Sequence, residues 1–185
     1  MIDIPAGTLQ PQRTHWSLLN RPLEHEQGAS PGFLKAGVDA TFPDASAAVG
    51  GSLILVARAT KPYRGYRLAF ASGARDPRYS CEGGGSIPLS RGCWKSTNFT
   101  IPPTNEFVTV NIPFSNFSDH WAPPTGDHKS TCPEDKSTCV TAKVLSKIQR
   151  IEVWAEGETA NIHLEVQSIS ARIDDRSQDL ESILG

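Results

Sequence analysis

Residues 107–117 read Phe-Val-Thr-Val-Asn-Ile-Pro-Phe-Ser-Asn-Phe, and they carry the strongest indication of the fold. Apolar and polar side chains alternate from Val108 to Ile112, which is the period of a strand with one buried face. Pro113 then ends the strand, and aromatic residues flank the corner that follows. Two later runs, residues 148–154 and 162–169, are also patterned as strands. Such runs predict an all-β domain.

The rest of the chain contains further short strand patterns and no convincing helix between them. We expect strands at 33–42, 52–58, 64–72, 93–101, 106–112, 148–155 and 161–171. Residues 52–58 are continuously apolar, as in a central strand that is buried on both faces. In the next strand, Tyr66, Leu68 and Phe70 would share one face. About seven short strands predict a β-sandwich of jelly-roll type.

The 185 residues divide into one domain and two tails. We expect an extended arm over 1–32, a sandwich domain over 33–171 and a C-terminal tail over 172–185. Within the domain, residues 118–147 form a long irregular segment, and loops of that length are usually functional, disordered or covalently pinned. The two tails carry apolar residues that an isolated domain does not need, which favours docking onto a partner.

Composition indicates neither nucleic-acid binding nor a membrane-spanning helix. The net charge of −2 supplies no basic field of the kind that captures nucleic acid. The apolar runs fall well short of the roughly 20 residues that a membrane-spanning helix needs. The N-terminus lacks the features of a signal or transit peptide, so we expect a mature or truncated form without its targeting segment. The alternative is a protein that works where it is made.

The four cysteines form two local pairs, each in a loop rich in glycine or proline. Four cysteines allow three connectivities, and the sequence does not choose between them. We expect Cys81–Cys93 and Cys132–Cys139, because local disulfides would staple two loops that have little else to hold them. Free thiols are one alternative, and a zinc site with nearby histidines is a weaker one, since the spacings are not those of a zinc knuckle. Disulfides would indicate an oxidising compartment.

Four segments, in this order, resemble the complex I intermediate-associated protein 30 family. They are Gly65-Tyr-Arg-Leu-Ala-Phe70, residues 107–117 as quoted above, Lys147-Ile-Gln-Arg-Ile-Glu-Val153 and Ile162-His-Leu-Glu-Val-Gln-Ser-Ile169. The resemblance implies a galactose-binding-like jelly roll without catalytic activity or a cofactor. It also implies an assembly factor or accessory subunit, peripheral to the membrane, that binds proteins of respiratory complex I or a photosystem. The implied location is a mitochondrion or a plastid thylakoid, with the lumen favoured if the cysteines are oxidised.

The residues themselves indicate a binding surface more clearly than a catalytic site. Aromatic side chains at strand ends and in loops can stack on sugar rings or bury into protein partners. The candidates are Tyr79, Arg91, Trp94, Asp119 and Trp121. They would also serve the alternative function, a carbohydrate-binding module of jelly-roll type. The simpler interpretation is that Trp94 and Trp121 cap the ends of the barrel.

Other motifs give weaker indications of chemistry. The pairs Asp119-His120 and Asp127-His128 could form a metal or acid–base site, but solvated loop polarity explains them as well. Gly83-Gly84-Gly85 neither follows an expected strand nor opens a helix, so it does not predict a dinucleotide site. The sequence contains no nucleophile elbow. We therefore expect no catalytic residue, no metal and no cofactor.

Overall fold

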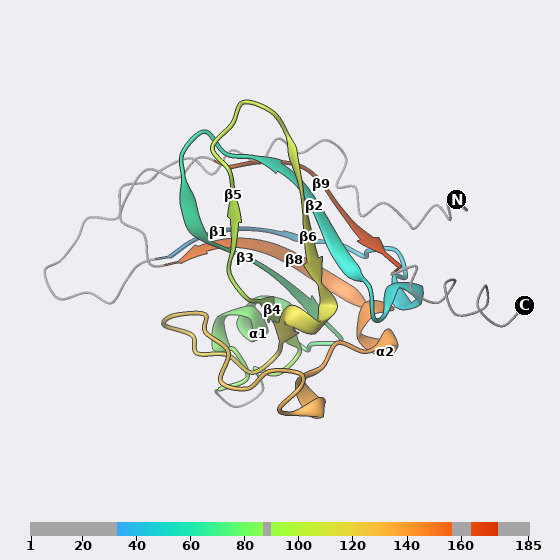
Figure 1. Ribbon diagram of the computed structural model, residues 1–185. Coiled ribbons are helices and arrows are strands. Elements are labelled where there is room, and N and C mark those ends of the chain that lie inside the picture. Colours follow the sequence, from blue (N-terminus) through green and yellow to red (C-terminus); the bar gives the residue numbers. More distant parts are fainter. Residues whose placement is uncertain (1–32, 87–89, 157–163, 174–185) are drawn as a thin grey trace, which may run out of the picture.

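A computed structural model of the chain describes residues 33–86, 90–156 and 164–173. These residues form two antiparallel sheets that pack face to face (Figure 1). The expectation of an all-β sandwich is therefore confirmed. The arm expected at 1–32 and nearly all of the tail expected at 172–185 lie outside the described residues. In the part of the chain that is described, no helix has the length and apolar character to cross a membrane.

The larger sheet is built around one long central strand. Its strands are β1 (Phe33–Asp39), β8 (Ile148–Glu156), β3 (Tyr63–Ser72), β4 (Cys93–Ser96), β7 (Phe117–Ser118) and β5 (Phe99–Ile101). The order is β1-β8-β3-β4-β7, and β5 also pairs with β3. One edge of β3 pairs with β8, where Leu68 lies opposite Val153. Its other edge pairs with β5 near its start and with β4 near its end.

The smaller sheet has the order β6-β2-β9. Its strands are β6 (Val108–Pro113), β2 (Ser52–Arg58) and β9 (Glu165–Arg172). The continuously apolar strand β2 is central, as expected. Its Leu55 lies opposite Val110 of β6 and Ile169 of β9. A bulge between Val56 and Ala57 shifts the register with β9.

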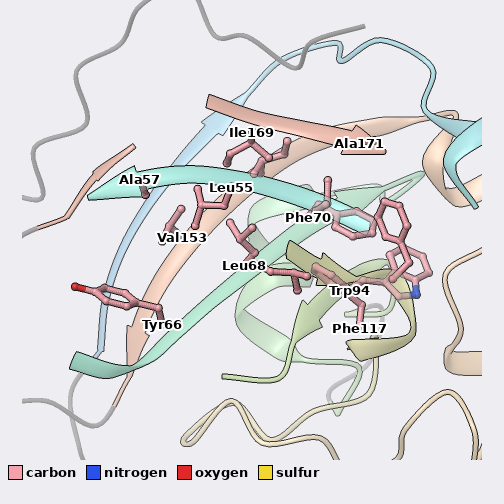
Figure 2. Close-up of a cluster of buried hydrophobic side chains, with 14 of the residues drawn as sticks. Leu55, Ala57, Tyr66, Leu68, Phe70, Trp94, Phe117, Val153, Ile169 and Ala171 are labelled. Carbon is pink, nitrogen blue, oxygen red and sulfur yellow. The ribbon is translucent and has the colours of Figure 1, made fainter. Parts of the chain in front are cut away.

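The core lies between the two sheets and takes one face of each strand (Figure 2). Leu55 from the smaller sheet and Leu68 from the larger one are both fully buried. Aromatic residues fill the end of the core near β4 and β7. There Phe70 stacks on Trp94 at 5.9 Å between ring centroids and lies 5.3 Å from Phe117. The alternation expected for Tyr66, Leu68 and Phe70 is confirmed, because all three belong to this core.

Short helices interrupt the expected loops, so the expectation of a chain without helices is wrong. They are the α-helices α1 (Pro77–Gly83) and α2 (Ala142–Leu145), and the 3-10 helices η1 (Ser46–Ala48), η2 (Phe114–Asn116) and η3 (Lys136–Thr138). Helix α1 begins at a cap that the sequence does encode. The Asp76 side chain accepts a hydrogen bond from Tyr79 N at 3.0 Å, and Pro77 stands in the first turn. The strand expected at 93–101 is two strands in the structure, β4 and β5, because residues 97 and 98 between them belong to neither strand.

Gly84 ends α1 in the left-handed conformation, with φ of 58°, and lies against Trp121. A Cβ there would lie 2.5 Å from Trp121 O and 2.8 Å from its indole ring. We expect Gly84→Ala to lower the free energy of unfolding by about 3 kcal/mol, because backbone strain and overpacking add. Urea unfolding monitored by circular dichroism measures the change.

Gly73→Ala is the matched control for this substitution. Gly73 also has a positive φ, 61°, but nothing lies within 4 Å of an added Cβ. Gly73→Ala should therefore lower the free energy of unfolding only through backbone strain, by about 1 kcal/mol. Equal losses in the two variants would show that the contact between Gly84 and Trp121 is not tight.

Candidate functional site

The outer face of the larger sheet, which points away from the core, carries charged side chains that are buried. The alternation of strand residues places Arg67, Lys95 and Glu152 on this face. The exposed fraction is 6% for Arg67 and 0% for Lys95 and Glu152. A sheet face in contact with water would leave such side chains exposed. Another part of the chain must therefore cover this face.

Helix α1 provides part of the cover. Cys81 of α1 forms a second buried cluster with Ala69, Ala71, Cys93 and Trp154 of the sheet. The Cys81–Cys93 disulfide joins the helix covalently to β4. The expected pairing of these two cysteines is confirmed. Figure 1 shows α1 against the larger sheet, on the side away from β2, β6 and β9.

The covering loop, residues 119–141, provides the rest of the cover, and Trp121 anchors this loop to the sheet. The Trp121 side chain is fully buried, with its ring centroid 6.1 Å from that of Trp154. Its indole Nε1 donates to Cys93 O at 3.3 Å, and its backbone N donates to Gly84 O at 2.9 Å. The covering loop is therefore tied both to β4 and to the end of α1.

Lys95 lies between the two tryptophans. Its Nζ is 3.5 Å from the ring centroid of Trp154 and 4.1 Å from that of Trp121. Such cation–π contacts are strongest where water is excluded. On the other side of Trp154, Lys35 Nζ lies 5.0 Å from the ring centroid. The His128 ring bonds to Lys95 O at 2.7 Å, so the covering loop also contacts the backbone of β4.

A buried ion-pair network continues along β8. Arg150 Nε donates to Glu152 at 2.5 Å, and Trp154 Nε1 donates to the other oxygen of the same carboxylate at 2.8 Å. Arg150 Nη1 also donates to Asp39 of β1 at 2.6 Å. The hydrogen bond from Arg150 is the main reason that the pKa of Asp39 lies below its usual value. Arg150, Glu152 and Asp39 are thus paired with one another.

Asp119 fixes the start of the covering loop through a bidentate ion pair. Arg91 Nε and Nη2 donate to the two carboxylate oxygens at 2.7 and 2.8 Å. The Asp119 side chain is buried, whereas about half of Arg91 is exposed. Burial raises the pKa of Asp119, and the positive charge of Arg91 opposes that shift. The pair holds the loop against the segment that leads into β4.

The second disulfide, Cys132–Cys139, closes a turn near the end of the covering loop. This pairing is also as expected. Inside the turn, the Asp135 side chain accepts from Ser137 N at 2.9 Å, and Glu134 accepts from Thr131 N at 2.8 Å. Because hydrogen bonds, a disulfide and a buried indole hold it, the covering loop has a defined shape.

The structure separates the five residues expected at a binding surface. Arg91, Asp119 and Trp121 come together, and Tyr79 of α1 is exposed. Trp94 lies on the opposite face of β4, where it packs in the core against Phe70. Three of the five, Trp94, Asp119 and Trp121, are buried and therefore do not form an open surface. Trp121 caps no barrel end either, because it lies beneath the covering loop.

The two Asp-His pairs of the covering loop have separate protein partners. His120 Nδ1 lies 2.9 Å from Ser130 Oγ, and Asp127 accepts from Arg67 at 2.7 Å. Within 33–86, 90–156 and 164–173, the structure places no group of three or more His, Cys, Asp and Glu side chains where they could hold a metal ion. The arrangement of these pairs does not indicate acid–base chemistry.

Sequence reasoning missed the buried charges, Lys95, Arg150 and Glu152. By alternation alone they belong to a face that is opposite the core, which normally means a solvated face. The signal that could have found them is Trp154, a large aromatic side chain that shares this face with Glu152. An aromatic residue among charges, beside a long irregular segment, is typical of a covered sheet face.

Comparison with models of known protein families gives no match for this chain, and comparison with curated proteins gives none either.

Because His128 is largely buried, we expect the protein to lose stability in mild acid. Burial lowers the pKa of this ring below its usual value of about 6.5. Because the unfolded chain then binds a proton more readily than the folded one, stability is retained at neutral pH and falls as the pH drops below about 6.5. Comparison of urea unfolding at pH 7.5 and pH 5.5 measures this loss.

His128→Asn is the control for this pH dependence. Its amide can still donate to Lys95 O but does not titrate, so the variant should lose less stability than the natural chain over the same interval. All other titrating groups are common to both chains and cancel in the comparison. Equal losses would assign the pH dependence to groups other than His128.

Proposed function

We propose that this chain is a non-catalytic protein-binding domain that serves as an assembly factor or accessory subunit of a membrane electron-transport complex. The observation that carries the proposal is the covering loop, which has no long regular element and yet is fixed in shape. Trp121 and the Arg91–Asp119 pair hold it on the larger sheet, and the Cys132–Cys139 disulfide closes a turn within it. A preformed loop loses little conformational entropy on binding, so it suits recognition of a partner.

The pairing of the buried charges supports binding over catalysis. Catalytic groups need an open position that a substrate can reach. Here Glu152 is bonded to Arg150 and Trp154, and Asp119 is bonded to Arg91. These groups stabilise the cover of the sheet, and a substrate would have to displace their partners.

The choice of partner rests on the resemblance to the complex I intermediate-associated protein 30 family. The four segments that carry it contribute to β3, β6, β8 and β9, so they supply strands to both sheets. The partner would be a protein subunit of respiratory complex I or of a photosystem. Two disulfides favour an oxidising compartment, and among organelles the thylakoid lumen is favoured over the mitochondrial matrix.

The carbohydrate-binding alternative loses its main support from the structure. It requires aromatic faces that are open to a sugar ring. Trp94 is 8% exposed and Trp121 is fully buried. Tyr79 is the exposed aromatic residue among the candidates, and it stands on α1 beside the covering loop.

A charge-reversal experiment tests the proposed binding surface. Lys129 and Lys136 are exposed on the covering loop, and the double variant Lys129→Glu/Lys136→Glu reverses both charges. Like charges facing each other across an interface cost several kcal/mol, so we expect at least an about tenfold lower affinity for the complex. The readout is the fraction of tagged chain that co-migrates with solubilised membrane complexes on a native gel.

The control is Lys61→Glu/Arg64→Glu, which makes the same change in net charge elsewhere. Lys61 lies in the connection between β2 and β3, which stands at the top of Figure 1, while the covering loop stands at the bottom. The control should co-migrate like the natural chain. The proposal fails if the natural chain runs alone, or if both variants lose the complex to the same extent.

A further inference from the structure

The two disulfides differ in their accessibility to a reagent in solution. Cys81 and Cys93 are both 0% exposed, because they lie between α1 and the sheet. Cys132 and Cys139 are partly exposed. Thiol–disulfide exchange requires a thiolate to reach one of the sulfur atoms directly. The folded protein therefore shields the first disulfide more completely than the second.

The Cys132–Cys139 disulfide closes a turn that has its own hydrogen bonds and in which Thr138 is buried. Thr138 Oγ1 donates to Asp135 O at 2.8 Å within the turn. Toward the body of the protein, Arg91 donates to Ser137 O over 3.4 Å, which is long for a hydrogen bond. Opening the disulfide should loosen this part of the covering loop without unfolding the sandwich.

We propose that Cys132–Cys139 is an exchange site for a dithiol reductant, and that its reduction loosens the loop surface on which the proposed function rests. A thiolate of the reductant attacks one sulfur atom, the S–S bond breaks, and the other cysteine leaves as a thiolate. The second thiol of the reductant then closes its own disulfide and releases the first cysteine. Two electrons pass to the protein, and two protons from the dithiol complete its two thiols. Cys81–Cys93 stays oxidised and keeps α1 on the sheet.

Selective reduction tests the exchange site. The folded full chain is incubated with dithiothreitol for increasing times, alkylated, digested and analysed by mass spectrometry. We expect Cys132 and Cys139 to be alkylated at least about tenfold faster than Cys81 and Cys93, with the buried pair reacting at a similar rate only in denaturant. Equal rates in the folded chain, or faster reaction of Cys81 and Cys93, would overturn the assignment.

Limited trypsin digestion tests the loosening. Lys136 lies between the two cysteines, and the exposed Arg64 lies at the start of β3, far from them. In the variant Cys132→Ser/Cys139→Ser, cleavage after Lys136 should be about tenfold faster than in the oxidised chain, while cleavage after Arg64 is unchanged. An unchanged rate at Lys136 would show that the disulfide does not hold the loop. Faster cleavage at both sites would mean that the whole domain is destabilised, which also contradicts the proposal.

The two tests do not depend on the identity of the partner. If the chain binds no membrane complex in either redox state, the proposed function fails while both results above stand. If the natural chain binds and Cys132→Ser/Cys139→Ser binds at least about tenfold more weakly, the exchange site controls the binding surface. Equal binding by the two chains would refute that control.

Discussion

Trp121→Ala should lower the free energy of unfolding by about 3–5 kcal/mol, one of the two largest effects that we expect. The indole is fully buried, packs against Trp154 and contacts the Lys95 ammonium group. Alanine would leave a cavity beneath the covering loop and remove one aromatic face from a buried cation. Urea unfolding monitored by circular dichroism gives the change.

Trp121→Phe separates packing from anchoring. Phenylalanine keeps an aromatic ring near Lys95 but cannot donate to Cys93 O, which now accepts from the indole. It should therefore cost less than alanine, about 1–3 kcal/mol. A loss below about 1 kcal/mol for Trp121→Ala would mean that the covering loop is not clamped on the sheet. The binding proposal would then lose its preformed surface.

Glu152→Ala should be about as severe, with a loss of about 3–5 kcal/mol. The carboxylate is fully buried and accepts from both Arg150 and Trp154. Removing it leaves the Arg150 charge, itself nearly buried, without its closest partner. Thermal unfolding should show a lower melting temperature for the variant, and urea unfolding gives the free energy.

Two further variants test the origin of that loss. Glu165→Ala breaks the Arg58–Glu165 ion pair at 2.7 Å, whose arginine is one third exposed, and should cost about 1 kcal/mol or less. Arg150→Met/Glu152→Leu removes both charges and should cost less than Glu152→Ala alone, because no unpaired charge stays buried. If the double variant is less stable than Glu152→Ala, the ion-pair network makes a net contribution to the stability of the fold and does more than neutralise its own buried charges.

The sequence predicted the sandwich because strands of the smaller sheet carry clear local patterns. Val108 to Ile112 alternates along β6, and the continuous apolar run of β2 places that strand at the centre of its sheet. Local cysteine pairing was also predictable, since short separations favour disulfides between neighbours in the chain. Such signals are local, and local sequence reports them well.

The cover of the larger sheet could not be predicted in the same way. Helix α1 is too short for a helical period, and only Asp76 and Pro77 mark its start. Trp94 and Trp121 looked alike in sequence, yet one faces the core and the other lies beneath the covering loop. Their positions depend on contacts between distant segments, which no local pattern contains.

Chemical cross-linking in native membranes tests the central claim most directly, the claim that the covering loop binds a subunit of an electron-transport complex. Membranes that contain this chain are treated with a lysine-reactive cross-linker, and the linked peptides are identified by mass spectrometry. Lys129 and Lys136, both exposed on the covering loop, should link to subunits of a photosystem or of respiratory complex I. Links to such subunits only through Lys61, at the opposite end of the sandwich, or links only within the chain itself, would contradict the account.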